Sequence, residues 1–191
     1  MTLESGEGTT KTSGSVKIRT ANAGTTGASG MLVFSSGTAS SGNSGWVMIG
    51  SGAATGGRGG AISLAVGSGN SGSGGYLRMQ AGRSTSVTGG SVTLESGEGT
   101  LTTSGSVKIR SANSGGTGAS GMLVFSSGTA SAGNSGLVMI GSGAATGGRG
   151  GSISLAVGSG NSGSGGYLSL ASGRSTVVTG GSVAMWSGEG T

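Results

Sequence analysis

The sequence predicts an all-β fold, a single-chain parallel β-solenoid (β-helix) with about 15 residues per coil, about 12–13 rungs and two strand segments per coil. A phrase led by glycine returns at a spacing of 15 residues, and its leading glycines include Gly45, Gly60, Gly75, Gly90 and Gly105. Apolar residues recur at fixed offsets within this phrase, and small residues fill most of the remainder. Self-similarity at a fixed short period is the sequence signature of repeat architectures.

The apolar offsets predict which side chains face inward. Positions are counted from the leading glycine as one. Position three holds Val16, Leu32, Val47, Ile62, Leu77 and Val92, and position five holds Ile18, Phe34, Ile49, Leu64, Met79 and Leu94. Because successive side chains of a strand face opposite sides, we expect positions three and five to point inward and position four outward. Stacked coils would join the inward groups into one apolar stripe.

The other half of each coil is built from small residues, as in Ala53-Ala54-Thr55-Gly56-Gly57. We expect these residues to let the second wall lie close to the first, and glycines at the corners to supply the φ > 0 that sharp turns require. Flexible coil is the alternative for a chain this rich in glycine and serine. A flexible linker, however, has no reason to keep Val, Ile or Leu at fixed offsets along its whole length.

A longer repeat lies over the short one. A shift of 91 residues superimposes nearly everything, so that Ser15–Arg19 matches Ser106–Arg110. Each 91-residue copy holds five repeats of 15 residues and one of 16, and the longer repeat begins at Gly14 or Gly105. We therefore predict a single β-solenoid domain over residues 1–191, built from two near-identical copies and cut from a longer array.

Charge placement supports this register. Coils stacked in phase would place opposite charges side by side in four pairs, Glu4–Arg19, Glu95–Arg110, Arg83–Glu98 and Arg174–Glu189. Each pair is worth only ~0.2–1 kcal/mol. Together they would penalise a slipped rung.

The composition argues against an enzyme. The 191 residues include 49 glycines and no Cys, Pro or His, and the five acidic residues are all glutamates. The side chains from which nucleophilic, metal and acid–base sites are usually built are therefore missing. We expect no catalytic residue, no cofactor and no metal site. The net charge of +5 predicts weak attraction to polyanions, but no basic run marks a nucleic-acid groove, and no apolar stretch reaches the ~20 residues of a membrane span.

The sequence predicts two distinctive features on the surface of the chain. One is a possible contact patch of apolar side chains at outward positions two and four, made of Met31, Val33, Trp46 and Met48 in the first copy and Met122, Val124, Leu137 and Met139 in the second. Such a patch marks a contact surface or reflects ordinary β-propensity on a half-exposed face. The other is a polar column at position eleven (Ser40, Thr55, Asn70, Thr85, Thr100, Ser131 and Thr146), which is read either as an ice-binding array or as a ladder of hydroxyls along an edge.

Phrases such as Ser35–Gly45 and Val66–Gly72 resemble the long Gly/Ser-rich repeat arrays of very large secreted or surface proteins of diatoms and related algae. The resemblance implies an extracellular or cell-surface location and a structural or adhesive role. The bulky residues Trp46, Tyr76 and Trp186 depart from such arrays.

We therefore expect a non-enzymatic structural or adhesive repeat segment of a large extracellular protein, which acts as a stiff spacer or stalk. The alternatives are a surface-binding β-solenoid with one flat wall for ice, mineral or polysaccharide, and a self-assembling fibril-former. The partners expected are further copies, end to end or side by side, and an anionic surface or polysaccharide. Nucleic acid is not expected.

Overall fold

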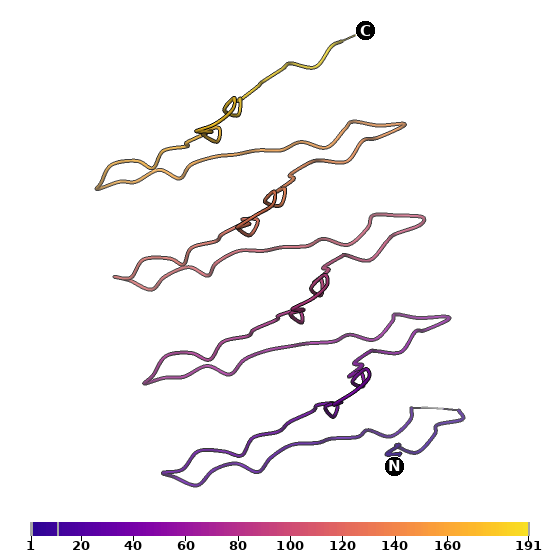
Figure 1. Cartoon of the computed structure of the whole chain (residues 1–191). Coiled ribbons are helices and arrows are strands. Elements are labelled where there is room, and N and C mark those ends of the chain that lie inside the picture. Colours follow the sequence, from indigo (N-terminus) through magenta and orange to yellow (C-terminus); the bar gives the residue numbers. More distant parts are fainter. Residues whose placement is uncertain (1, 11, 191) are drawn as a thin grey trace. The chain divides into compact units, whose positions relative to one another are not determined.

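The computed structural model describes residues 2–10 and 12–190. Over these ranges the backbone forms no helix and no strand, and irregular, drawn-out segments alternate with bends (Figure 1). The predicted all-β class, and with it the β-solenoid or β-helix of 12–13 stacked rungs, is therefore wrong. No helix in the described part of the chain is long and apolar enough to cross a membrane.

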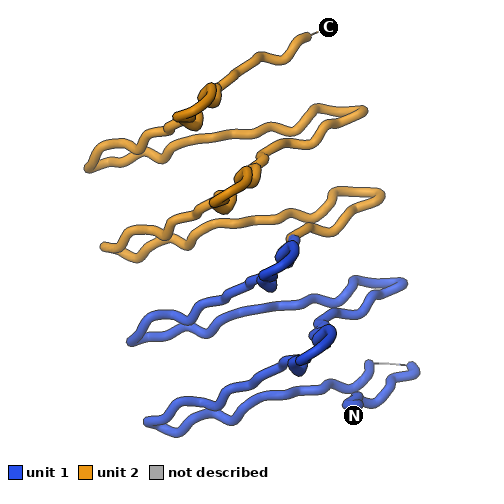
Figure 2. Tube along the Cα trace, in the orientation of Figure 1, with its two compact units in different colours: residues 1–93 blue, residues 94–191 orange. Residues whose placement is uncertain are grey.

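The chain divides into two units, Met1–Thr93 (unit 1) and Leu94–Thr191 (unit 2), which Figure 2 shows in blue and orange. The boundary lies close to Val92, the residue that matches Met1 after the 91-residue shift. Local features recur in both units at this spacing, so each can be checked against its counterpart.

The period of the sequence appears in the backbone as a series of bends. They fall at 40–42, 55–57, 70–72 and 85–87 in unit 1, and at 100–102, 131–133, 146–148, 161–163 and 176–178 in unit 2. Each bend occupies positions eleven to thirteen of its repeat. In the two 16-residue repeats, turns at 25–26 and 116–117 stand in the same place. The extra residue of these repeats is thus taken up within the loop.

Each bend lies in a loop whose two ends meet at a neck. There the leading glycine of one repeat lies against position seven or eight of the repeat before it. In several loops the glycine N–H donates to the carbonyl oxygen at position eight, and these N···O distances are 3.1 Å for Gly14–Gly6, 3.2 Å for Gly60–Gly52, 2.9 Å for Gly90–Gly82, 2.9 Å for Gly105–Gly97, 3.2 Å for Gly151–Gly143 and 2.9 Å for Gly181–Gly173.

At Gly60, Gly75, Gly151 and Gly166 this close approach leaves no room for a side chain. A Cβ atom at Gly60 would lie 2.8 Å from the Cβ of Ser51, and one at Gly151 would lie 2.9 Å from the Cβ of Ser142. The expected role of glycine as the source of φ > 0 corners is wrong, since within the described residues only Gly42 has a positive φ, of 120°. The neck therefore selects glycine for its missing side chain rather than for its backbone freedom.

The predicted apolar core does not form. No side chain of the described residues is buried, and Val47, Ile62 and Leu77, which were expected to point inward, remain exposed. A weaker signature of the expected alternation survives, because Val47 is 53% exposed between Trp46 at 86% and Met48 at 81%. Positions three and two therefore differ in exposure, but neither is removed from water.

The four predicted opposite-charge pairs do not form hydrogen-bonded contacts. The side-chain hydrogen bonds among the described residues involve no glutamate. These pairs depended on stacked coils, and the stacking is absent.

The number of bends in each repeat explains why the predicted solenoid does not form. A coil with two walls must reverse direction at least twice in each repeat, and this backbone bends at one place per repeat. Repeats therefore meet at their necks rather than along their length. Without paired lengths, no hydrogen-bonded ladder joins the repeats within residues 2–10 and 12–190, and the side chains at positions three and five stay exposed there.

Candidate functional site

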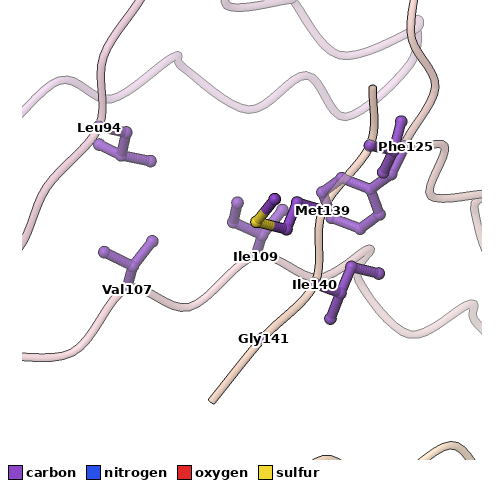
Figure 3. Close-up of a pocket in the computed structure, with 8 residues that line it drawn as sticks. Leu94, Val107, Ile109, Phe125, Met139, Ile140 and Gly141 are labelled. Carbon is purple, nitrogen blue, oxygen red and sulfur yellow. The ribbon is translucent and has the colours of Figure 1, made fainter. Parts of the chain in front are cut away.

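Side chains at positions three and five gather around an open apolar hollow in unit 2 (Figure 3). Its volume is about 820 Å³, and its lining residues are Leu94, Val107, Ile109, Phe125, Val138, Met139, Ile140 and Gly141. They come from four successive repeats. Most of these side chains come from positions three and five, but Met139, at position four and expected to face outward, lines the same hollow. The side chains surround an open space instead of packing into a core.

A smaller hollow in unit 1 repeats part of this arrangement. Phe34, Val47, Met48 and Ile49 line a space of about 370 Å³. These residues precede Phe125, Val138, Met139 and Ile140 of unit 2 by 91 positions. Both hollows are lined by hydrocarbon and thioether groups, with no titratable side chain, so they can bind apolar groups but supply no acid, base or nucleophile.

The predicted contact patch is exposed throughout but is not gathered into one site. Of its eight residues, Met48 and Met139 belong to the linings of the hollows. The position-two residues Met31, Trp46, Met122 and Leu137 are highly exposed, at 79–86%, and Val33 and Val124 less so, at 62% each. A role for the whole patch as a contact surface stays a prediction.

The residues of the polar column at position eleven stand at the start of the bends. Ser40, Thr55, Asn70, Thr85, Thr100, Ser131 and Thr146 are each the first residue of one. A serine hydroxyl one position before the bend stabilises the bends at 85–87 and 176–178. Ser84 Oγ accepts from the N–H groups of Ser86 (3.4 Å) and Val87 (3.0 Å). Ser175 Oγ does the same for Val177 (3.3 Å) and Val178 (3.0 Å). Neither serine was singled out from the sequence.

Two polar recesses were also missed by the sequence analysis. Arg19, Thr20, Ala21 and Asn22 line a recess of about 310 Å³, and Arg110, Ser111, Ala112 and Asn113 line one of about 240 Å³. Both recesses occupy positions six to nine of the 16-residue repeat. The signal that would have found them is the coincidence of an arginine, a hydroxyl and an asparagine in the one repeat of each copy that differs in length.

No group of three His, Cys, Asp or Glu residues that could hold a metal ion occurs within residues 2–10 and 12–190. Arg78 donates through a guanidinium N–H to Oε1 of Gln80, two residues along the same segment. The linings of these sites suit apolar groups in the hollows and acceptors of hydrogen bonds in the recesses.

Comparison with protein-family models, curated proteins and solved structures finds no match to this chain.

Proposed function

We propose that this chain is a non-enzymatic structural repeat segment that acts as a spacer with adhesive surfaces in a large extracellular or cell-surface protein. The observation that supports the proposal most directly is the area of the chain that faces water. The accessible surface is 19007 Å², and no side chain of the described residues is buried.

This surface differs greatly from that of a compact protein. A folded monomer of 17.6 kDa exposes about 7900 Å², and the same chain fully unfolded exposes about 25500 Å². The observed value lies nearer the second figure. A chain whose side chains are exposed and form no core suits the role of a spacer. Small-angle X-ray scattering tests the proposal.

A compact chain of 191 residues has a radius of gyration of about 16 Å, and an unfolded one about 47 Å. We expect the dilute full chain to exceed the compact value by at least about half. A radius near 16 Å would exclude a spacer of this kind.

Self-assembly is a second candidate function, favoured by the apolar hollow of unit 2. Its lining includes Ile109 at 53% exposure and Phe125 at 63%. Exposed apolar groups gathered in one place often mark contact surfaces. Another copy of the chain offers the same groups at the same spacing, so both copies would remove apolar surface from water on association.

Sedimentation velocity across a range of concentrations tests self-assembly. We expect the mean sedimentation coefficient to rise with concentration for the unchanged chain, and to rise much less for Ile109→Ser. Met122→Ser is the matched control, because Met122 is apolar but does not line the hollow. A coefficient independent of concentration, or equal effects of the two substitutions, would reject assembly through this hollow.

A further inference from the structure

We propose that the two polar recesses are binding sites for the carboxylate-bearing sugar units of an acidic polysaccharide. One site is formed by Arg19, Thr20, Ala21 and Asn22, and the other by Arg110, Ser111, Ala112 and Asn113. This proposal goes beyond the spacer function and is independent of self-assembly, since it rests on different residues and on a different chemistry.

The first support is that the recess occurs twice. Four consecutive residues line it in each unit, at positions related by the 91-residue shift. The volumes, about 310 Å³ in unit 1 and about 240 Å³ in unit 2, are similar although position seven changes from Thr20 to Ser111. Threonine and serine both present a hydroxyl, so the exchange keeps the polar group.

The second support is the set of hydrogen-bonding groups. A guanidinium presents five N–H donors in a planar fork that matches a carboxylate, and its charge persists at all ordinary pH values. The neighbouring asparagine amide donates and accepts, as sugar hydroxyls require. Thr20 Oγ1 donates to the carbonyl oxygen of Gly30 at 3.2 Å, which fixes the hydroxyl beside the loop neck and leaves its oxygen free to accept.

The third support is the local excess of positive charge. Lys17 and Lys108 stand two residues before the arginines of the two recesses. Four of the chain's ten basic residues therefore belong to the two 16-residue repeats, and the side-chain hydrogen bonds of the described residues include no glutamate that would occupy them.

The volumes of the recesses and the presence of one recess in each unit point to a polymer of charged sugars. A space of 240–310 Å³ lies at the lower end of small-molecule sites, which begin at about 300 Å³. It suits one sugar unit at a time. A single exposed arginine site binds weakly, and two such sites on one chain gain strength when a long polymer occupies both.

Binding of the full chain to immobilised polygalacturonate at low ionic strength tests the proposal. Arg19→Gln/Arg110→Gln removes one guanidinium from each recess. Because hydrogen bonds to charged groups are among the stronger ones, we expect the affinity to fall by about tenfold or more. Arg58→Gln/Arg149→Gln is the matched control, which removes the same charge from another loop of each unit, and we expect it to lower the affinity by about twofold at most.

A charge-neutral variant separates recognition from general attraction. Asn22→Ala/Asn113→Ala leaves the net charge unchanged, and we expect it to weaken polygalacturonate binding by about threefold to tenfold through the lost amide contacts. Neutral dextran should not bind. Equal losses for the two arginine pairs, no loss for the asparagine pair, or binding to dextran sulfate that is as strong and as sensitive to the asparagines would each overturn the proposal.

Discussion

Gly59 and Gly60 stand next to each other in the sequence but in different surroundings. A Cβ at Gly60 would lie 2.8 Å from the Cβ of Ser51, whereas a Cβ at Gly59 would meet nothing within 4 Å. Gly60 also donates the backbone hydrogen bond that closes its loop on Gly52. Contacts under 3 Å between carbon atoms force the chain apart, so a methyl group at position 60 should open the neck.

We therefore expect Gly60→Ala to speed amide hydrogen exchange at residue 60 by about threefold to tenfold, the equivalent of one lost hydrogen bond of ~1 kcal/mol. Gly59→Ala is the control and should leave the exchange of Gly60 nearly unchanged. Equal exchange rates at residue 60 in the two variants would show that crowding at the neck does not select glycine there.

Ser84 offers a second prediction at the residue scale. Its hydroxyl oxygen accepts from the N–H groups of Ser86 and Val87, which holds the bend at 85–87. Serine hydroxyls stabilise turns in this way. We expect Ser84→Ala to speed amide exchange of Val87 by about twofold to tenfold. Ser86→Ala, which keeps the acceptor, is the comparison, and the Ser175→Ala change in unit 2 should reproduce the effect at Val178.

At the scale of elements, each repeat consists of a drawn-out leg, positions one to seven, and a loop that its neck encloses. The 16-residue repeats show that a loop takes up an extra residue, since the turn at 25–26 replaces the bend of the shorter repeats. A leg has no such freedom. Its side chains differ in exposure from one position to the next, as Trp46 at 86% and Val47 at 53% show, so a shift of one residue changes the surroundings of each side chain.

An insertion of one glycine tests this difference. Placed between Gly56 and Gly57, it lies in a loop and should leave the hollow of Phe34, Val47, Met48 and Ile49 unchanged. Placed between Val47 and Met48, it separates two residues that line the hollow and shifts Met48 and Ile49 by one position along the leg. We expect fluorescence of the apolar dye ANS to fall by roughly a third to a half for the leg insertion, because one of two hollows is lost. Equal fluorescence would mean that the legs have no fixed facing.

The elements also show how far the sequence could be interpreted. The apolar residues at positions three and five could be identified from their spacing, and Val107, Ile109, Val138 and Ile140 line one hollow in the structure. The expected outward facing of position four is not observed there, since Met139 lines the same hollow. The number of times that the backbone reverses direction in each repeat could not be inferred from the sequence. A glycine such as Gly60 is compatible with a corner or with a close approach, and the sequence alone does not distinguish them.

At the scale of the molecule, the large exposed area determines the response to denaturant. Unfolding a compact 17.6 kDa chain exposes about 17600 Å², but this chain, already at 19007 Å², has only about 6500 Å² left to expose. The denaturant slope m scales with the area exposed on unfolding. We expect an m value in urea of about a third of that of a compact domain of equal length. A steep, cooperative transition at low protein concentration would contradict the open structure.

The whole-molecule prediction failed because it required cooperation between repeats. Val47, Ile62 and Leu77 have the chemistry of core residues, and in a stacked coil each would cover the next. Every repeat supplies few bulky groups, and its many glycines lose much conformational freedom when they are fixed. The polar recesses were not predicted from the sequence for a related reason. Arg19 and Asn22 are three residues apart, and only the course of the backbone makes them neighbours.

The enclosed loops make this chain a promising carrier for foreign peptides. At Gly52 and Gly60 the two ends of a loop are joined by one hydrogen bond of 3.2 Å, and the residues between them contribute nothing to either leg. An unrelated sequence grafted between these glycines would begin and end at adjacent points. Several different epitopes could then be displayed on one molecule, one in each loop whose neck carries such a hydrogen bond.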